Sequence, residues 1–193
     1  HIFKRFIRSD TALEDMAKIV LYDVKSVVAS LCPQKIDHLS MYSRQIKLTA
    51  DVPSYPRAEE IADEAQKYCR IDGTGWLKQV QYLLQNGIHQ QTEDVEVQYF
   101  SLENGCLCGV SNEVMVEFAL RVSELLHDNF FYFGGYTNGC TGYFPTKEEF
   151  DMGGYEVYWS MLIYYVYHGR VFPLRRDSAS ELIRFVAENA PNI

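Results

Sequence analysis

The sequence contains no apolar run long enough to cross a bilayer. A membrane-spanning helix needs about 18 or more consecutive apolar residues, and the richest stretch, residues 155–167, is interrupted by Glu156 and Ser160. Positive charge is also scarce, because 18 Lys and Arg stand against 26 Asp and Glu, for a net charge of −8. This balance argues against a general nucleic-acid binder, which needs a basic surface to meet phosphates.

Cysteine is too rare, and odd in number, for a disulfide framework. The chain has five cysteines in 193 residues, and Cys106 and Cys108 are spaced so that a strand would place both on one face, where packing is their simplest role. We therefore expect a reducing compartment and a cytoplasmic location, with secretion as the alternative. The basic residues Lys4, Arg5 and Arg8 lead into no apolar run of signal-peptide length.

Several common catalytic motifs are absent. No two of the five histidines have the spacing of a zinc-binding helix, and there is no H-E-x-x-H sequence. There is no G-x-S-x-G nucleophile elbow, and Asp72-Gly73 lacks the spacing of a Walker phosphate loop. The chain by itself therefore does not supply a standard zinc site, which takes about three protein ligands and a water.

The sequence does contain enough apolar residues, 47%, for the core of one domain. Apolar residues recur at helical spacing over residues 10–31, after Ser9 or Asp10 as N-cap, and this pattern predicts an amphipathic helix whose stripe faces a core. Residues 38–49 alternate between apolar and polar, but the phase changes between Met41 and Ile46. This change predicts a strand with a bulge.

Further along, strands and helices follow one another without a regular βαβ repeat. The pattern predicts a hairpin around Asn104-Gly105 and a strand over residues 130–136. Helices are predicted over residues 56–69, 76–85 and 112–126, after Thr146, and from Asp177 or Ser178. These elements indicate an α+β fold, a mainly antiparallel sheet flanked by helices.

Three residues between Val110 and Tyr155 are candidates for chemistry. Glu113 is expected in the first turn of its helix, where the dipole favours a carboxylate, and it is either a plain dipole partner or an oxygen ligand for a metal. Tyr143 follows a Gly/Thr/Asn loop, and Tyr155 follows a glycine pair. Each is either a packed tyrosine or a functional phenol, and a phenolate near neutral pH needs a cation beside it.

The segment from Asn112 to Tyr155 resembles the C-terminal part of the catalytic domain of the neutral/alkaline ceramidase family. The matching residues, in the order of the family pattern, are Asn112-Glu113, Arg121, Phe131 to Gly135, Thr137-Asn138, Gly142-Tyr143, Thr146, Glu148-Glu149 and Tyr155-Glu156. The order and spacing of these residues are specific, and they cover about a quarter of the chain. The resemblance implies that residues 1–193 are the C-terminal portion of one larger catalytic domain.

The resemblance also implies a zinc-dependent amidase that cleaves the N-acyl bond of ceramide or a related N-acyl lipid. Carried over, Glu113 and Tyr143 are zinc ligands, and Tyr155 hydrogen-bonds at the scissile amide. The family's two zinc-binding histidines and its site serine belong to the preceding half of the domain, which is therefore an expected partner. The chain alone, with too few ligands, is expected to be inactive.

An alternative from another class is a non-catalytic domain that keeps this fold without the chemistry. In that interpretation the aromatic run from Tyr155 to Tyr167 lines a groove for a lipid or a sugar. Neither interpretation involves nucleic acid or a transmembrane segment.

Overall fold

The computed structural model describes Ser9 and residues 11–191, and the chain divides into two units at His38. The second unit has an α+β fold. In chain order the elements of the described residues are α1 (Ala12–Ser30), β1 (Leu39–Asp51), α2 (Tyr55–Cys69), α3 (Thr74–Gln85), β2 (Gln90–Leu102), β3 (Gly105–Gly109), β4 (Glu113–Val114), α4 (Val116–Leu126), β5 (Phe131–Gly134), β6 (Tyr143–Phe144), α5 (Lys147–Met152), the π-helix η1 (Tyr155–Trp159), α6 (Met161–His168) and α7 (Ser178–Glu188).

The first unit contains the predicted amphipathic helix, α1, but its apolar stripe is not a core face. The helix begins after Thr11 rather than Ser9, and Asp10 lies outside the described residues. None of its residues is buried, and Leu13 is 80% exposed. The expectation of a core-facing stripe was wrong for this unit, because its described residues form a single helix with no second layer to pack against.

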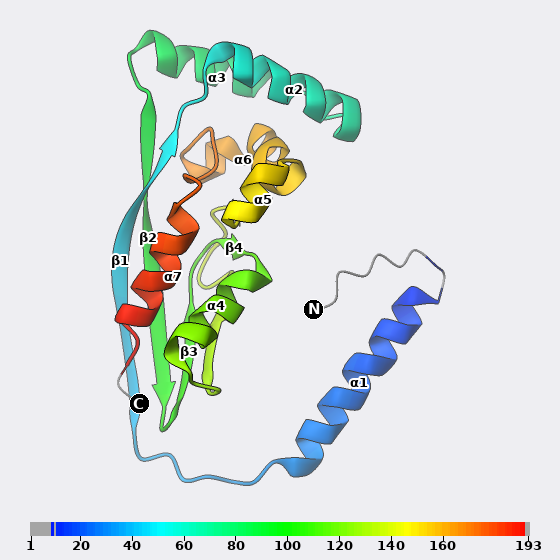
Figure 1. Ribbon diagram of the computed structural model, residues 1–193, viewed down its shortest axis with the longest axis vertical. Helices are drawn as coiled ribbons and strands as arrows, with labels where there is room; N and C mark the ends of the chain where they lie inside the picture. The colour runs from blue at the N-terminus through cyan, green and yellow to red at the C-terminus, as the bar shows by residue number, and fades with distance from the viewer. Residues whose placement is uncertain (1–8, 10, 192–193) are drawn as a thin grey trace. The chain divides into compact units, whose positions relative to one another are not determined.

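The main sheet of the second unit has the strand order β1-β2-β3-β5 (Figure 1). The first two pairs are antiparallel, and β3 and β5 are parallel. The hairpin predicted at Asn104-Gly105 is confirmed, since Leu102 pairs with Gly105 across it. The predicted bulge was wrong, because β1 and β2 pair without interruption from Leu39 to Asp51.

The phase change that suggested a bulge has a simpler cause. The apolar residues near the start of β1 lie on one face of the strand, and those further along lie on the other. Ile46 points to the inner face, which packs against α4 and α7, whereas Met41 points to the opposite face. The inner face forms the main core together with the two helices (Figure 1). Its fully buried side chains include Val97, Tyr99 and Phe118.

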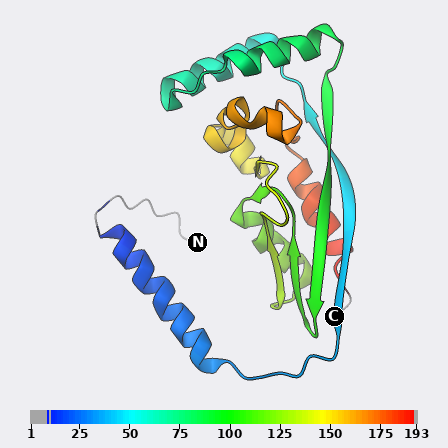
Figure 2. The ribbon, with the colours of Figure 1, turned by 180° about the vertical axis from the view of Figure 1, so that it is seen from behind.

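The outer face of the sheet carries a row of apolar side chains, one from each strand. Met41 lies opposite Phe100, Phe100 opposite Leu107, and Leu107 opposite Tyr132. Met41, Leu107 and Tyr132 are exposed, and the row borders a groove of about 390 Å³. Figure 2 shows this face of the strands. An exposed apolar row of this kind is typical of a surface that contacts another molecule or segment.

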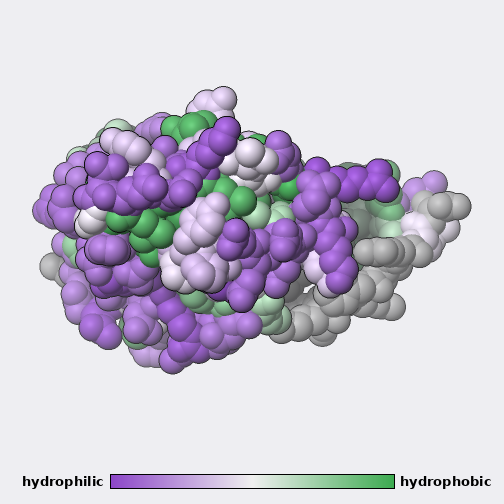
Figure 3. Space-filling model, turned by 90° about the horizontal axis from the view of Figure 1, so that it is seen from above, coloured by the Kyte–Doolittle hydropathy of each residue, from purple (hydrophilic) through white to green (hydrophobic). Residues whose placement is uncertain are grey.

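A second, smaller core joins α2 and α3 to η1 and α6 at one end of the sheet (Figure 1). Its anchor is Trp76, whose indole nitrogen donates to the carbonyl oxygen of Val171 at 2.7 Å. Seen from this end, the surface is mostly hydrophilic, with some apolar side chains between the polar ones (Figure 3). The aromatic stretch after Gly154, which showed no clear periodicity, forms the π-helix η1 and then α6.

The cysteines behave as the sequence suggested. Cys106 and Cys108 are both buried and share the inner face of β3. Cys32, Cys69 and Cys140 are exposed free thiols. Among the described residues, the helices are all too short or too polar to cross a membrane.

Candidate functional site

Glu113 lies on a short strand and not in a helix, so the prediction of a helix-opening acid was wrong. The following helix, α4, begins at Val116 after Met115 as N-cap, and the acid in its first turn is Glu117. Glu113 is instead paired with a neighbouring strand, and Asn112 is fully buried. The backbone here is committed to strand pairing, and therefore the helix cannot start until three residues later.

The two-residue strands β4 and β6 pair in parallel and place Glu113 directly beside Tyr143. The Glu113 amide donates to the carbonyl oxygen of Gly142 at 2.9 Å, and the Thr141 amide donates to that of Ser111 at 3.1 Å. Glu113 and Tyr143 are half-buried, while Phe144 is buried against Phe118 with ring centroids 5.1 Å apart. The structure therefore brings together two of the residues that the sequence singled out.

Two phenols, Tyr136 and Tyr143, have pKa values that Glu113 raises. Burial is the largest cause that raises the pKa of Tyr143, followed by the charges of Glu113 and Glu156 and a hydrogen bond with Glu113. A hydrogen bond with Glu113 is the largest cause that raises the pKa of Tyr136 to about 12. A carboxylate that accepts a phenol hydrogen bond favours the protonated phenol. Both phenols therefore keep their protons at neutral pH.

Tyr155 joins this group from the other side. The turn at Gly153 and Gly154, with φ of 67° and 92°, leads the chain into η1 and places the Tyr155 ring edge-on to Tyr143, with ring centroids 6.1 Å apart. Burial is the largest cause that raises the pKa of Tyr155, and the next are the charge of Tyr164 and a hydrogen bond with it. All three predicted residues therefore lie in one cluster of a carboxylate and phenols.

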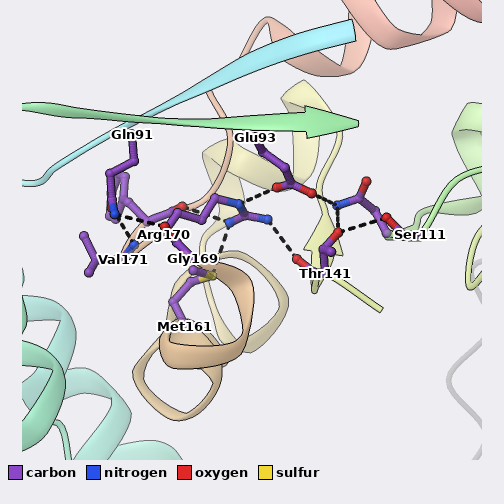
Figure 4. Close-up of polar contacts among 10 residues, drawn as sticks. Gln91, Glu93, Ser111, Thr141, Met161, Gly169, Arg170 and Val171 are labelled. Atoms are coloured by element: carbon purple, nitrogen blue, oxygen red, sulfur yellow. Dashed lines mark hydrogen bonds and ion pairs between the residues drawn. The ribbon is translucent and has the colours of Figure 1, made fainter. Parts of the chain in front are cut away.

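A buried ion pair joins Arg170 to Glu93 (Figure 4). The Arg170 side chain is 1% exposed, and its Nε donates to Glu93 Oε2 at 2.8 Å. Its other nitrogens donate to the carbonyl oxygens of Phe172 at 2.9 Å and Thr141 at 3.1 Å. Since Thr141 lies just before Gly142-Tyr143, this guanidinium holds the segment that presents Tyr143.

The second oxygen of Glu93 extends the network to the other strand. Asn112 Nδ2 donates to Glu93 Oε1 at 3.2 Å and to Thr141 Oγ1 at 2.7 Å (Figure 4). Asn112 immediately precedes Glu113, so the polar contacts run in a closed circuit from Arg170 through Glu93, Asn112 and Thr141 back to Arg170. The two residues that pair in β4 and β6 are thus tied together on their inner side.

Two glycines let other groups approach this region closely. A β-carbon on Gly135 would lie 2.3 Å from the carbonyl oxygen of Asn112. One on Gly142, where φ is 88°, would lie 2.4 Å from Cε1 of His168. Burial and the charge of Arg170 lower the pKa of His168, against an opposing effect of Glu93. His168 therefore lies within electrostatic reach of the buried network, and its ring also lies beside Tyr164, with ring centroids 5.8 Å apart.

The fit of this cluster to zinc is partial. Zinc sites use nitrogen, sulfur and carboxylate oxygen ligands, usually three from the protein at a catalytic centre, and Glu113 and Tyr143 offer two adjacent oxygens. Among the described residues, no three or more His, Cys, Asp and Glu side chains are grouped so that they could hold a metal ion. The cluster therefore offers two oxygen donors, fewer than a catalytic zinc site takes from its protein.

Sequence reasoning did not identify Tyr136, Tyr164, Arg170 or Glu93. One signal was available for Glu93: it occupies an inward position in the alternation of β2, in phase with the buried Val95 and Val97. A charged residue at an inward position has to be paired. Nothing in the local sequence named its partner, because Arg170 lies far along the chain, beyond α6.

Comparison with known proteins gives no match, neither to a family model, nor to a curated protein, nor to a solved structure.

Proposed function

We propose that this chain is part of a zinc-dependent amide hydrolase of the neutral ceramidase type, acting on ceramide or a related N-acyl lipid. The observation that carries the proposal is that Glu113, Tyr143 and Tyr155, which were selected from a sequence resemblance, meet in one cluster. The three residues lie on separate elements, and no local rule of folding requires them to meet. An amidase site would explain why these three residues lie together.

In this proposal each side chain has a distinct task. Glu113 and Tyr143 would hold the ion through their oxygens, and the ion, when bound, would polarise the substrate carbonyl and acidify a water toward a pKa of about 7. Tyr155 donates its phenol proton in a hydrogen bond to the amide oxygen as negative charge develops there. The raised pKa of Tyr155 suits this task, because the phenol is protonated at neutral pH.

Nitrogen ligands would come from the preceding half of a ceramidase-type domain. Two surfaces of the described residues are suited to contact such a segment: the exposed apolar stripe of α1, and the outer row of the sheet at Met41, Leu107 and Tyr132. Each is an unpartnered apolar surface in its own unit. Burying apolar surface of this kind contributes about 25 cal/mol per Å², which favours association with another part of the protein.

The experiment is an amidase assay on the protein expressed from its complete reading frame, with an N-acyl sphingosine and Zn²⁺. We expect release of fatty acid that is abolished by chelation and by Glu113→Ala. Tyr155→Phe is expected to lower kcat by about 10²-fold or more, since removing one such donor typically costs that much. Glu117→Ala is the matched control, because Glu117 lies in the first turn of α4 and outside the cluster. Absence of bound zinc at neutral pH would refute the mechanism.

The second candidate, a binding domain without chemistry, is favoured by one observation. A cavity of about 340 Å³ lies between α2 and η1, and its lining includes Tyr68, Tyr158 and Trp159. Aromatic side chains of this kind suit a lipid chain or a sugar ring. If the complete protein binds the N-acyl lipid equally well with and without Glu113→Ala, and hydrolyses it in neither form, the binding domain is the correct interpretation.

A further inference from the structure

We infer that Arg170 is a positioning residue that sets the pairing of Glu113 with Tyr143 from the buried side of the β4–β6 ribbon. The inference deepens the proposed function and rests on it for its purpose, but its geometry stands independently. Arg170 touches none of the phenols in the contacts described above. It acts through Glu93, Thr141 and Asn112.

The ribbon needs such a support because it is very short. β4 and β6 have two residues each, and strands of this length are not stable as an isolated pair. Backbone bonds from the Glu113 and Thr141 amides join the two segments where the ribbon begins. Since a shift of one residue would move Tyr143 to the opposite face, the pairing has to be fixed by contacts outside the ribbon.

Arginine suits this task because its planar guanidinium presents donors in fixed directions. Here those donors reach three separate segments: Glu93 on β2, Thr141 before β6, and Phe172 after α6. A buried ion pair is an inefficient source of stability, because apolar residues of the same volume often stabilise a protein as well. A directional role explains why a charge is kept at a site that is 1% exposed.

The closed circuit carries the constraint to both strands. Asn112, the residue before Glu113, donates from Nδ2 both to Glu93 and to the Thr141 hydroxyl. Because the circuit includes Asn112, next to Glu113, and Thr141, two residues before Tyr143, the two strands cannot slide without breaking one of these partly buried hydrogen bonds. A buried polar group that loses its partner costs about 1–3 kcal/mol.

The test follows the ionisation of Tyr143 in the metal-free chain, by NMR of ring-labelled tyrosine, with the signal assigned from its loss in Tyr143→Phe. The variant is Arg170→Met combined with Glu93→Leu, which removes both charges and leaves neither unpaired. We expect a folded chain in which the Tyr143 pKa shifts downward, because Tyr143 becomes less buried and Glu113 is no longer held beside it. Arg175→Met is the control, since Arg175 forms an exposed ion pair with Asp51, and no shift is expected there.

A milder variant keeps the test decisive if the double variant does not fold. Thr141→Val removes only the hydroxyl that accepts from Asn112 and leaves every buried charge paired, and a smaller downward shift is expected. An unchanged Tyr143 titration in either variant, once folded, overturns the positioning role. Neither zinc nor substrate is present in the measurement, so failure of the amidase proposal and failure of this inference are distinguishable.

Discussion

Gly142 is the position where a single methyl group should disturb the candidate site most. A β-carbon there would lie 2.4, 2.7 and 3.0 Å from Cε1, Nδ1 and Nε2 of His168, distances at which the ring has to move. The backbone φ of 88° adds a conformational cost of about 1–2 kcal/mol for any residue with a β-carbon. Overpacking against the half-buried His168 ring adds about 1–3 kcal/mol. Gly142→Ala should therefore destabilise the chain by about 2–5 kcal/mol.

The two contributions can be separated with matched variants in urea unfolding followed by circular dichroism. Gly87 has φ of 70° and no atom within 4 Å of its virtual β-carbon, so Gly87→Ala should show only the conformational cost of about 1–2 kcal/mol. In a His168→Ala background, Gly142→Ala should cost no more than Gly87→Ala does. If Gly142→Ala costs the same with and without the His168 ring, the steric reasoning is refuted.

Three further predictions follow from the same region. Glu113→Gln should lower the pKa of Tyr136 from about 12, and that of Tyr143, in a phenolate absorbance titration, because both phenols lose the nearby carboxylate charge. Unchanged midpoints would contradict the effect of Glu113 on both phenols. Because the folded chain lowers the pKa of His168, the neutral imidazole stabilises the fold fully above pH ~6.5, and this stabilisation is lost as the pH falls through the lowered value. Urea midpoints measured at several pH values should show this loss of stability, and His168→Gln should flatten the pH dependence. Phe144→Ala should cost about 3–5 kcal/mol by thermal unfolding, since the ring is 1% exposed, and Tyr167→Ala, at 79% exposure, should stay within ~0.5 kcal/mol of wild type.

Much of the fold could be predicted because local rules and tertiary packing agree there. The Asn104-Gly105 turn between alternating segments gave the β2–β3 hairpin, and Thr146, whose side chain accepts from the Glu149 amide at 3.3 Å, caps α5 as its sequence suggests. The last helix likewise begins at Ser178. In these places the residue that starts or ends an element makes its contact within a few positions along the chain.

The prediction for Glu113 failed because its conformation is decided by distant partners. A polar residue before an apolar helical pattern is the usual sign of an N-cap, and Ser111-Asn112 fits that sign. The Asn112 side chain is instead used by Glu93 and Thr141. A single sequence cannot show that competition, because both partners come from other elements. The cluster itself came from a resemblance in motif, not from the local pattern.

The corrected position of Glu113 changes the electrostatic argument for a metal. A carboxylate at a helix N-terminus would be stabilised by the dipole, but Glu113 instead raises the pKa of two phenols, Tyr136 and Tyr143, which keep their protons. If the proposed metal site is correct, uptake of a divalent ion between Glu113 and Tyr143 would release a phenol proton, and metal affinity should rise with pH. The cost of releasing that proton is offset by the backbone geometry. The pairing of β4 with β6 already holds Glu113 beside Tyr143, so that the two side chains can meet an ion without a rearrangement of the backbone.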